Sequence, residues 1–145
     1  MEQLAERVAD ALEGEVGGAL AGVSYYTADG VGHVYRSERA ADAYTVEAID
    51  AIVEDLQLEA FGHGAHERRH GQALHATVRI YDDLLDVLVP IDEQSGVAFA
   101  LFLDGDYRVR YVVERAERLV DASRFERTVL HPESVSAESP LSADE

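Results

Sequence analysis

The sequence of 145 residues contains no cysteine and no lysine. Without cysteine, the chain can form no disulfide, no Cys-ligated zinc or iron–sulfur site and no thiol nucleophile. No apolar run reaches the ~18–20 residues that a membrane-spanning helix needs, and the chain opens on an amphipathic pattern without the architecture of a signal peptide. These absences predict a soluble, cytoplasmic protein that has no membrane partner.

Positive charge is also scarce, because 29 acidic residues face only 12 basic ones, all of them arginine. The net charge of −17 repels phosphate backbones and anionic lipid, which excludes binding of nucleic acid by the whole surface. Near 1 M salt the screening length falls to ~3 Å, and the mutual repulsion of the carboxylates largely vanishes. This acidic, lysine-free composition resembles that of proteins from halophilic archaea, so we interpret most of the charge as adaptation to a salty cytoplasm.

The chain is long enough to bury one core, and 47% of its residues are apolar. Apolar residues recur at helical spacing in three segments, 2 to about 14, 41–60 and 109 to about 122. Residues 123–145 carry five serines and two of the three prolines. We therefore expect one domain over residues 1–122, followed by an acidic Ser/Glu-rich tail over 123–145 that is largely disordered.

Five further segments have the apolar patterns of strands, with turn residues such as Asp29-Gly30 between them. The hairpin links are too short for parallel crossovers, so these strands are expected to be antiparallel. The sequence thus predicts an α+β fold, a five-stranded antiparallel sheet with helices on its faces in the order α-β-β-α-β-β-β-α. The predicted strands are 23–27, 31–35, 73–81, 84–91 and 97–103.

Three local features accompany this element order. Gly17-Gly18-Ala19 leads into the first strand, Asp29-Gly30 forms the first hairpin, and the strand from Gly96 to Leu103 runs straight into the last helix. Together with the element order, they resemble the roadblock (dynein light-chain-like, profilin-like) domain, and the resemblance covers about residues 2–121. The GAF and PAS sensor folds share part of the same order.

The roadblock resemblance implies a small, non-enzymatic homodimer that binds other proteins, often a small GTPase or a complex that regulates one. It also implies that the third strand pairs edge to edge with its copy, with the outer face of residues 45–58 beside it. By position, the dimer interface would then contain Ala76, Val78 and Ile80. The residues themselves agree with this expectation, because an apolar edge strand whose only charge is Arg79 is poorly protected against pairing.

The arginines are unevenly distributed along the chain. Residues 108–127 hold six of the 12 against four acids, whereas residues 82–106 hold seven acids and no base. Arg108, Arg115 and Arg118 are therefore candidates for binding a carboxylate-rich protein partner or a phosphate through bidentate pairs. The alternative is that these arginines neutralise neighbouring acids on the same helix.

Four of the six histidines gather within thirteen residues, at His63, His66, His70 and His75. Imidazole is a ligand for zinc and nickel, but Arg68 and Arg69 lie among these histidines and oppose a cation. We interpret the segment as a polar loop between helix and strand and predict no metal. A metal- or pH-responsive loop remains the alternative.

The sequence offers no pairing of a nucleophile with a base. Asp82, Asp83 and Asp86 are expected by chance in so acidic a chain, and the glycines between Gly14 and Gly22 do not follow a strand and have no lysine beside them. We therefore predict no catalytic residue, no cofactor and no enzymatic activity.

Two functions remain open at this point. The first is the dimeric, protein-binding scaffold or regulator that the roadblock resemblance implies. The alternative is a GAF/PAS-like module that senses a small ligand in a pocket between sheet and helix. A cavity beside the small residues of the strands would distinguish them, and the candidates for its lining are Ala73, Ala76, Ala98 and Ala100.

Overall fold

The computed structural model describes the backbone of residues 1–130 and the side chains of residues 1–124. Its centre is one five-stranded sheet in the order β2-β1-β5-β4-β3, with every neighbouring pair antiparallel. The predicted α+β class and antiparallel sheet are therefore confirmed. The strands are β1 (Leu20–Thr27), β2 (Gly30–Arg36), β3 (Thr77–Ile80), β4 (Leu84–Pro90) and β5 (Gly96–Phe102).

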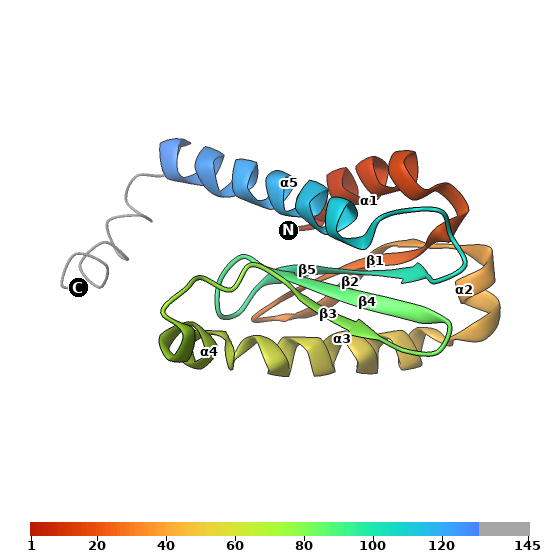
Figure 1. Cartoon of the computed structure of the whole chain (residues 1–145), viewed down its shortest axis with the longest axis horizontal. Helices are drawn as coiled ribbons and strands as arrows, with labels where there is room; N and C mark the ends of the chain where they lie inside the picture. The colour runs from red at the N-terminus through yellow and green to blue at the C-terminus, as the bar shows by residue number, and fades with distance from the viewer. Residues whose placement is uncertain (131–145) are drawn as a thin grey trace.

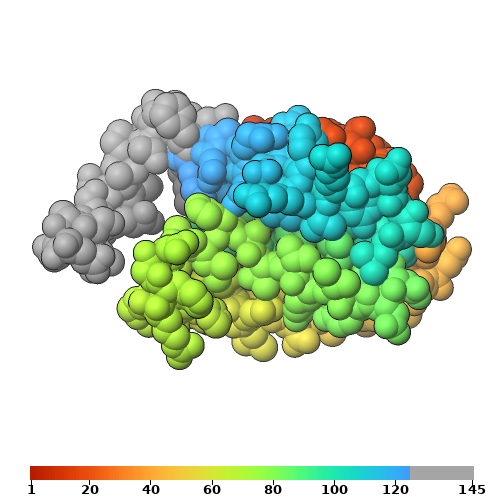
Figure 2. Space-filling model, in the orientation of Figure 1, coloured from red at the N-terminus to blue at the C-terminus, as the bar shows by residue number. Residues whose placement is uncertain are grey.

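Helices cover both faces of the sheet, so the molecule has three layers (Figure 1). Helices α1 and α5 lie side by side on one face of the sheet, and α3 and α4 lie on the opposite face. In the space-filling view of Figure 2, the region of β3 and β4 reaches the surface between these two helical layers. The helices are α1 (Glu2–Val16), α2 (Glu38–Ala43), α3 (Val46–Ala60), α4 (His63–His70) and α5 (Val109–Leu130), and a short 3₁₀ turn, η1, covers Gly17–Ala19.

The face under α1 and α5 holds the larger of the hydrophobic clusters. It is built from branched and aromatic side chains of the three central strands, which the apolar stripes of both helices cover. No helix in the described part of the chain is long and apolar enough to cross a membrane.

The single helix predicted over residues 41–60 is wrong, because the structure has two helices there. Helix α2 begins at Glu38, where the Ser37 hydroxyl accepts a hydrogen bond from the Ala40 N–H. Helix α3 begins anew after Thr45, whose hydroxyl accepts from the Ala48 N–H. Each hydroxyl satisfies a backbone donor that the first turn of a helix leaves free, so each starts its own helix.

The polar loop expected from His63 to His75 is also corrected. Its first eight residues form helix α4, which ends at Gly71 with a left-handed φ of 67°. Glycine adopts this conformation without the steric penalty that a Cβ would bring. The remaining residues extend toward β3, which covers only Thr77–Ile80 of the strand predicted over 73–81. Continuing its register would place His75 opposite Pro90, which has no N–H to donate.

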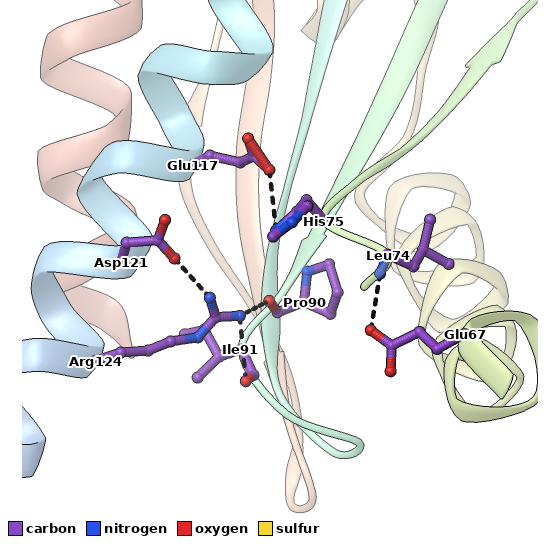
Figure 3. A network of polar contacts seen from close by, with 8 residues as sticks. All are labelled: Glu67, Leu74, His75, Pro90, Ile91, Glu117, Asp121 and Arg124. Carbon is purple, nitrogen blue, oxygen red and sulfur yellow. Dashed lines mark hydrogen bonds and ion pairs between the residues drawn. The ribbon is translucent and has the colours of Figure 1, made fainter. Parts of the chain in front are cut away.

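Helix α5 continues to Leu130 and does not end near residue 122 as expected. The sequence from Ser123 to Leu130 contains no glycine or proline that would stop it. Arg124 also fixes this part of the helix to the sheet, because its Nη2 donates to the Pro90 carbonyl at 2.5 Å (Figure 3). Of the predicted disordered tail, residues 131–145 lie outside the described residues.

Candidate functional site

The edge of the sheet at β3 exposes a group of apolar side chains. Strand β3 pairs with β4 on one side only, and 38% of Val78, 69% of Ile80 and 53% of Tyr81 are exposed. Val78 and Ile80 lie opposite two core residues, Val87 and Leu85, beyond the cover of the helices. The edge thus presents apolar side chains together with unpaired backbone groups.

The structure brings two of the three predicted interface residues to this edge. Val78 and Ile80 are exposed in β3 itself, whereas Ala76 precedes the strand and packs half-buried against the core. That this edge forms a dimer stays a prediction.

Arg79, the charged residue of β3, is turned away from the edge and into the molecule. Its guanidinium binds the Asp86 carboxylate through two hydrogen bonds, Nε to Oδ1 at 3.1 Å and Nη2 to Oδ2 at 3.2 Å. Its Nη1 lies 3.5 Å from Glu59 Oε2 on α3. Hydrogen bonding to Asp86 raises the pKa of Arg79 above its ordinary value, so the guanidinium stays charged. The charge that would protect an edge strand is therefore engaged inside.

The chain that leads into β3 is held from both helical layers (Figure 3). On one side, the Leu74 N–H donates to Glu67 Oε2 of α4 at 2.7 Å. On the other, His75 Nδ1 lies 3.5 Å from Glu117 Oε1 of α5. These contacts fix the entry of β3 between α4 and α5, so the edge is preformed.

The four clustered histidines do not converge on one point. His63 is buried and its Nε2 has no hydrogen-bond partner, while His66 and His70 are exposed on α4. His75 lies beyond the helix and faces Glu117. Among the residues that the structure describes, no group of three or more His, Asp or Glu side chains could hold a metal ion.

The arginine candidates lie on one side of α5, with Arg115 and Arg118 in the helix and Arg108 directly before its first residue. Residues 108, 111, 115 and 118 are spaced by three or four, which places Arg108, Tyr111, Arg115 and Arg118 on one stripe. Arg108, Tyr111 and Arg118 are exposed, and Arg115 Nε lies 3.8 Å from Glu15 Oε1 of α1. The structure thus assembles the predicted residues into a basic surface with an aromatic centre. Their role as a partner site stays a prediction.

A cavity of about 560 Å³ lies between the sheet and α3. Ala98 and Ala100 line it, as the ligand-sensor alternative required, whereas Ala73 and Ala76 do not. Its wall on the helix side includes the apolar side chains of Ile49, Ile52 and Val53. The volume is in the range of small-molecule pockets.

Sequence reasoning missed a chain of hydrogen bonds that borders this cavity. Ser24 Oγ of β1 lies 2.6 Å from His33 Nδ1 of β2, and His33 Nε2 lies 2.5 Å from Asp50 Oδ1 of α3. The three residues are widely separated in sequence and form no motif. The strand register that places Ser24 opposite His33 could have suggested the first contact.

The order Ser, His, Asp is also that of a nucleophile, a base and an orienting acid. An oxyanion hole, however, needs free backbone N–H groups beside the nucleophile. Strand β1 lies between β2 and β5, and Ser24 is paired in the ladder on both sides. The arrangement therefore supports a positioning role for these residues, in which they connect α3 to the sheet.

The structure is similar to solved roadblock proteins. The roadblock/LC7 domain from Streptomyces avermitilis has a TM-score of 0.53 and 16% identity, with 86% of this chain and 94% of that chain covered. MglB in a tetrameric arrangement has a TM-score of 0.58 and 15% identity, over 83% and 90%. The gliding protein MglB from Thermus thermophilus has a TM-score of 0.59 and 15% identity, over 82% and 87%.

These similarities show a roadblock-like fold and give no support to the GAF- or PAS-like alternative. No curated protein matches the chain in sequence. The family model described as a domain of unknown function, DUF7522, matches residues 6–121. Because this match spans most of the sequence, the chain belongs to the DUF7522 family.

Proposed function

We propose that the protein is a dimeric, non-enzymatic scaffold that binds another protein and regulates a small GTPase or a complex acting on one. The observation that carries this proposal is the preformed apolar edge of β3, with Val78, Ile80 and Tyr81 exposed. An exposed apolar edge strand pairs readily with another chain unless a partner covers it. A second copy, aligned antiparallel, would cover it by continuing the sheet.

Helix α3, which packs on the sheet face opposite α1 and α5, also carries exposed apolar residues. Val46 is 45% exposed and Leu58 67% exposed, and both lie in the segment expected to pack beside the dimer strand. Exposed apolar residues on both elements are typical of a subunit interface. One solved protein of this fold is described as having a tetrameric arrangement, which agrees with assembly of such a fold into oligomers.

The basic stripe of α5 is the proposed contact for the partner. Arg108, Arg115 and Arg118 form a locally positive surface on a molecule of net charge −17, so they attract carboxylates that the rest of the surface repels. Tyr111 supplies an exposed aromatic ring among them. The small GTPase is the partner that the roadblock resemblance implies.

Affinity capture from extract of the native cells, at high salt, tests the partner surface. The variant Arg108→Glu/Arg115→Glu/Arg118→Glu should lose the partner, because three attractive charges become repulsive. The matched control reverses three exposed arginines elsewhere, Arg7, Arg68 and Arg69, and should retain the partner. Equal capture by both triple variants would remove α5 from the proposal. Recovery of no GTPase or GTPase-associated protein by the wild type would contradict the proposed function.

A further inference from the structure

The cavity between the sheet and α3 exists because the two faces of the sheet differ in side-chain size. Along β5, Val97, Phe99 and Leu101 fill the core under α1 and α5. The alternate residues of the same strand, Ala98 and Ala100, lie on the sheet face that α2 and α3 cover, and both line the cavity. The small side chains leave room that the helix does not fill.

Neighbouring strands continue this floor of small residues. In the register, Gly22 lies opposite Ala100, and Ser24 lies opposite Ala98. On the helix side, Ile49 and Ile52 stay only partly buried although they point toward the sheet. Apolar walls that are held apart in a cavity open to solvent indicate space for an occupant.

Ser24 provides a polar anchor within these apolar walls. Its side chain is buried, with a relative exposure of 6%, and it lines the cavity. A hydroxyl has one donor and two acceptor positions, and the described residues give Ser24 Oγ one side-chain partner, His33. The hydroxyl therefore keeps hydrogen-bonding capacity for a group inside the cavity.

The charges around the cavity cancel. Asp86, 4% exposed, is neutralised by Arg79 through both carboxylate oxygens. The other charged residues of the lining, Arg36 and Asp55, are of opposite sign and exposed to solvent. In the buried part of the cavity the charged neighbours of an occupant are Arg79 and Asp86, which already neutralise each other, so a charge buried there is disfavoured.

We propose that this cavity binds one small, uncharged and largely apolar molecule that carries a carbonyl or hydroxyl oxygen. Its apolar body lies between Ala98, Ala100 and the isoleucines of α3, and its oxygen bonds to Ser24. The contact of His33 with Asp50 connects α3 to the sheet beside the ligand. This site does not depend on dimer formation and goes beyond the scaffold role.

The test uses prodan, an uncharged naphthalene ketone whose fluorescence reports both apolar burial and hydrogen bonding to its carbonyl. The full chain in high salt should bind it saturably at one site per chain. Ala98→Leu and Ala100→Leu fill the floor and should weaken binding about tenfold or more. The same substitution at the exposed Ala73 is the matched control and should leave binding unchanged. Ser24→Ala should weaken binding and shift the bound emission to the blue, because the carbonyl loses its donor.

Binding that is absent in the wild type, or equally tight in the filled variants, would overturn the proposal. Circular dichroism and a thermal melt establish that each variant folds. If the strand variants do not fold, Ile49→Phe fills the space from the helix side and should give the same loss. A second copy of the chain is the alternative occupant. If Ala98→Leu and Ala100→Leu change the mass measured by sedimentation but leave prodan binding unchanged, a second copy occupies the cavity and the proposal is contradicted. A monomeric Val78→Lys variant that still binds prodan separates this site from the dimer.

Discussion

Arg79 on β3 and Asp86 on β4 lie opposite each other in the strand register and form a two-point ion pair, with distances of 3.1 and 3.2 Å. Only 5% of the Asp86 side chain is exposed, against 27% of Arg79. The pair therefore fastens the edge strand to the sheet from within. It also explains why the edge itself is apolar, because its one charge is used for this contact.

Replacing Arg79 with leucine should destabilise the protein by about 2–3 kcal/mol, because the buried Asp86 carboxylate loses its partner. Because Arg79 is partly exposed to solvent, we expect the loss of stability to be smaller than for a fully buried ion pair. The double variant Arg79→Leu/Asp86→Leu should be less destabilised than Arg79→Leu alone. Urea unfolding at constant salt measures both, and a double variant that is as unstable as Arg79→Leu, or more so, would contradict the coupling.

The buried His63 should make stability depend on pH. Burial lowers its pKa below the ordinary value of 6.5, an effect that the charge of Glu67 partly opposes and that of His66 reinforces. The unfolded chain binds a proton at His63 more tightly than the folded chain does. Above pH 6.5 the histidine is neutral in both states and costs no stability. As the pH falls from 6.5 to the lower pKa of the folded state, the free energy of unfolding decreases.

His63→Leu should therefore reduce the fall in stability between neutral and mildly acidic pH. Melting temperatures across this range measure the slope, and His70→Leu serves as control because His70 is exposed on the same helix and its charge is not among the causes that shift the pKa of His63. If both variants keep the wild-type slope, burial of His63 does not contribute to the acid response.

The folded state should require salt. The net charge of −17 leaves carboxylates that no lysine compensates, and screening weakens their repulsion as the Debye length falls from ~10 Å at 0.1 M to ~3 Å at 1 M. We expect a higher melting temperature in multimolar KCl than in dilute buffer. Identical melting temperatures in the two would refute the interpretation of the acidic surface as adaptation to salt.

The strands were predictable from the sequence because two patterns are local signals: apolar residues at alternate positions, and short apolar runs between turn residues, as in β4 and β5. All five predicted strands are present, and the Asp29-Gly30 turn joins β1 to β2 where expected. The division of the second helix was less predictable, since Thr45 caps a helix only once the preceding chain has turned. The length of β3 depends on its partner, because Pro90 ends the ladder opposite His75.

Of the candidate sites, the edge of β3 could be predicted before the structure was known, whereas the hydrogen bonds of Ser24 and His33 and the cavity could not. Exposure of Val78 and Ile80 follows from the position of β3 at the edge of the sheet, which the roadblock resemblance implied. The contacts Ser24–His33 and His33–Asp50 depend on how β2 and α3 meet in space, and nothing in their spacing indicates it. The cavity likewise needs the register that aligns Gly22 with Ala100.

Sedimentation equilibrium of the wild type, at tens of micromolar chain in multimolar KCl, tests dimer formation through β3 most directly. The wild type should have twice the chain mass of 15.9 kDa. Val78→Lys should have the mass of one chain, because an unpaired charge at the edge opposes strand pairing. Tyr111→Lys, which adds the same charge on α5, should remain dimeric. A wild type that sediments at 15.9 kDa, or a Val78→Lys variant that is still dimeric, would contradict the account.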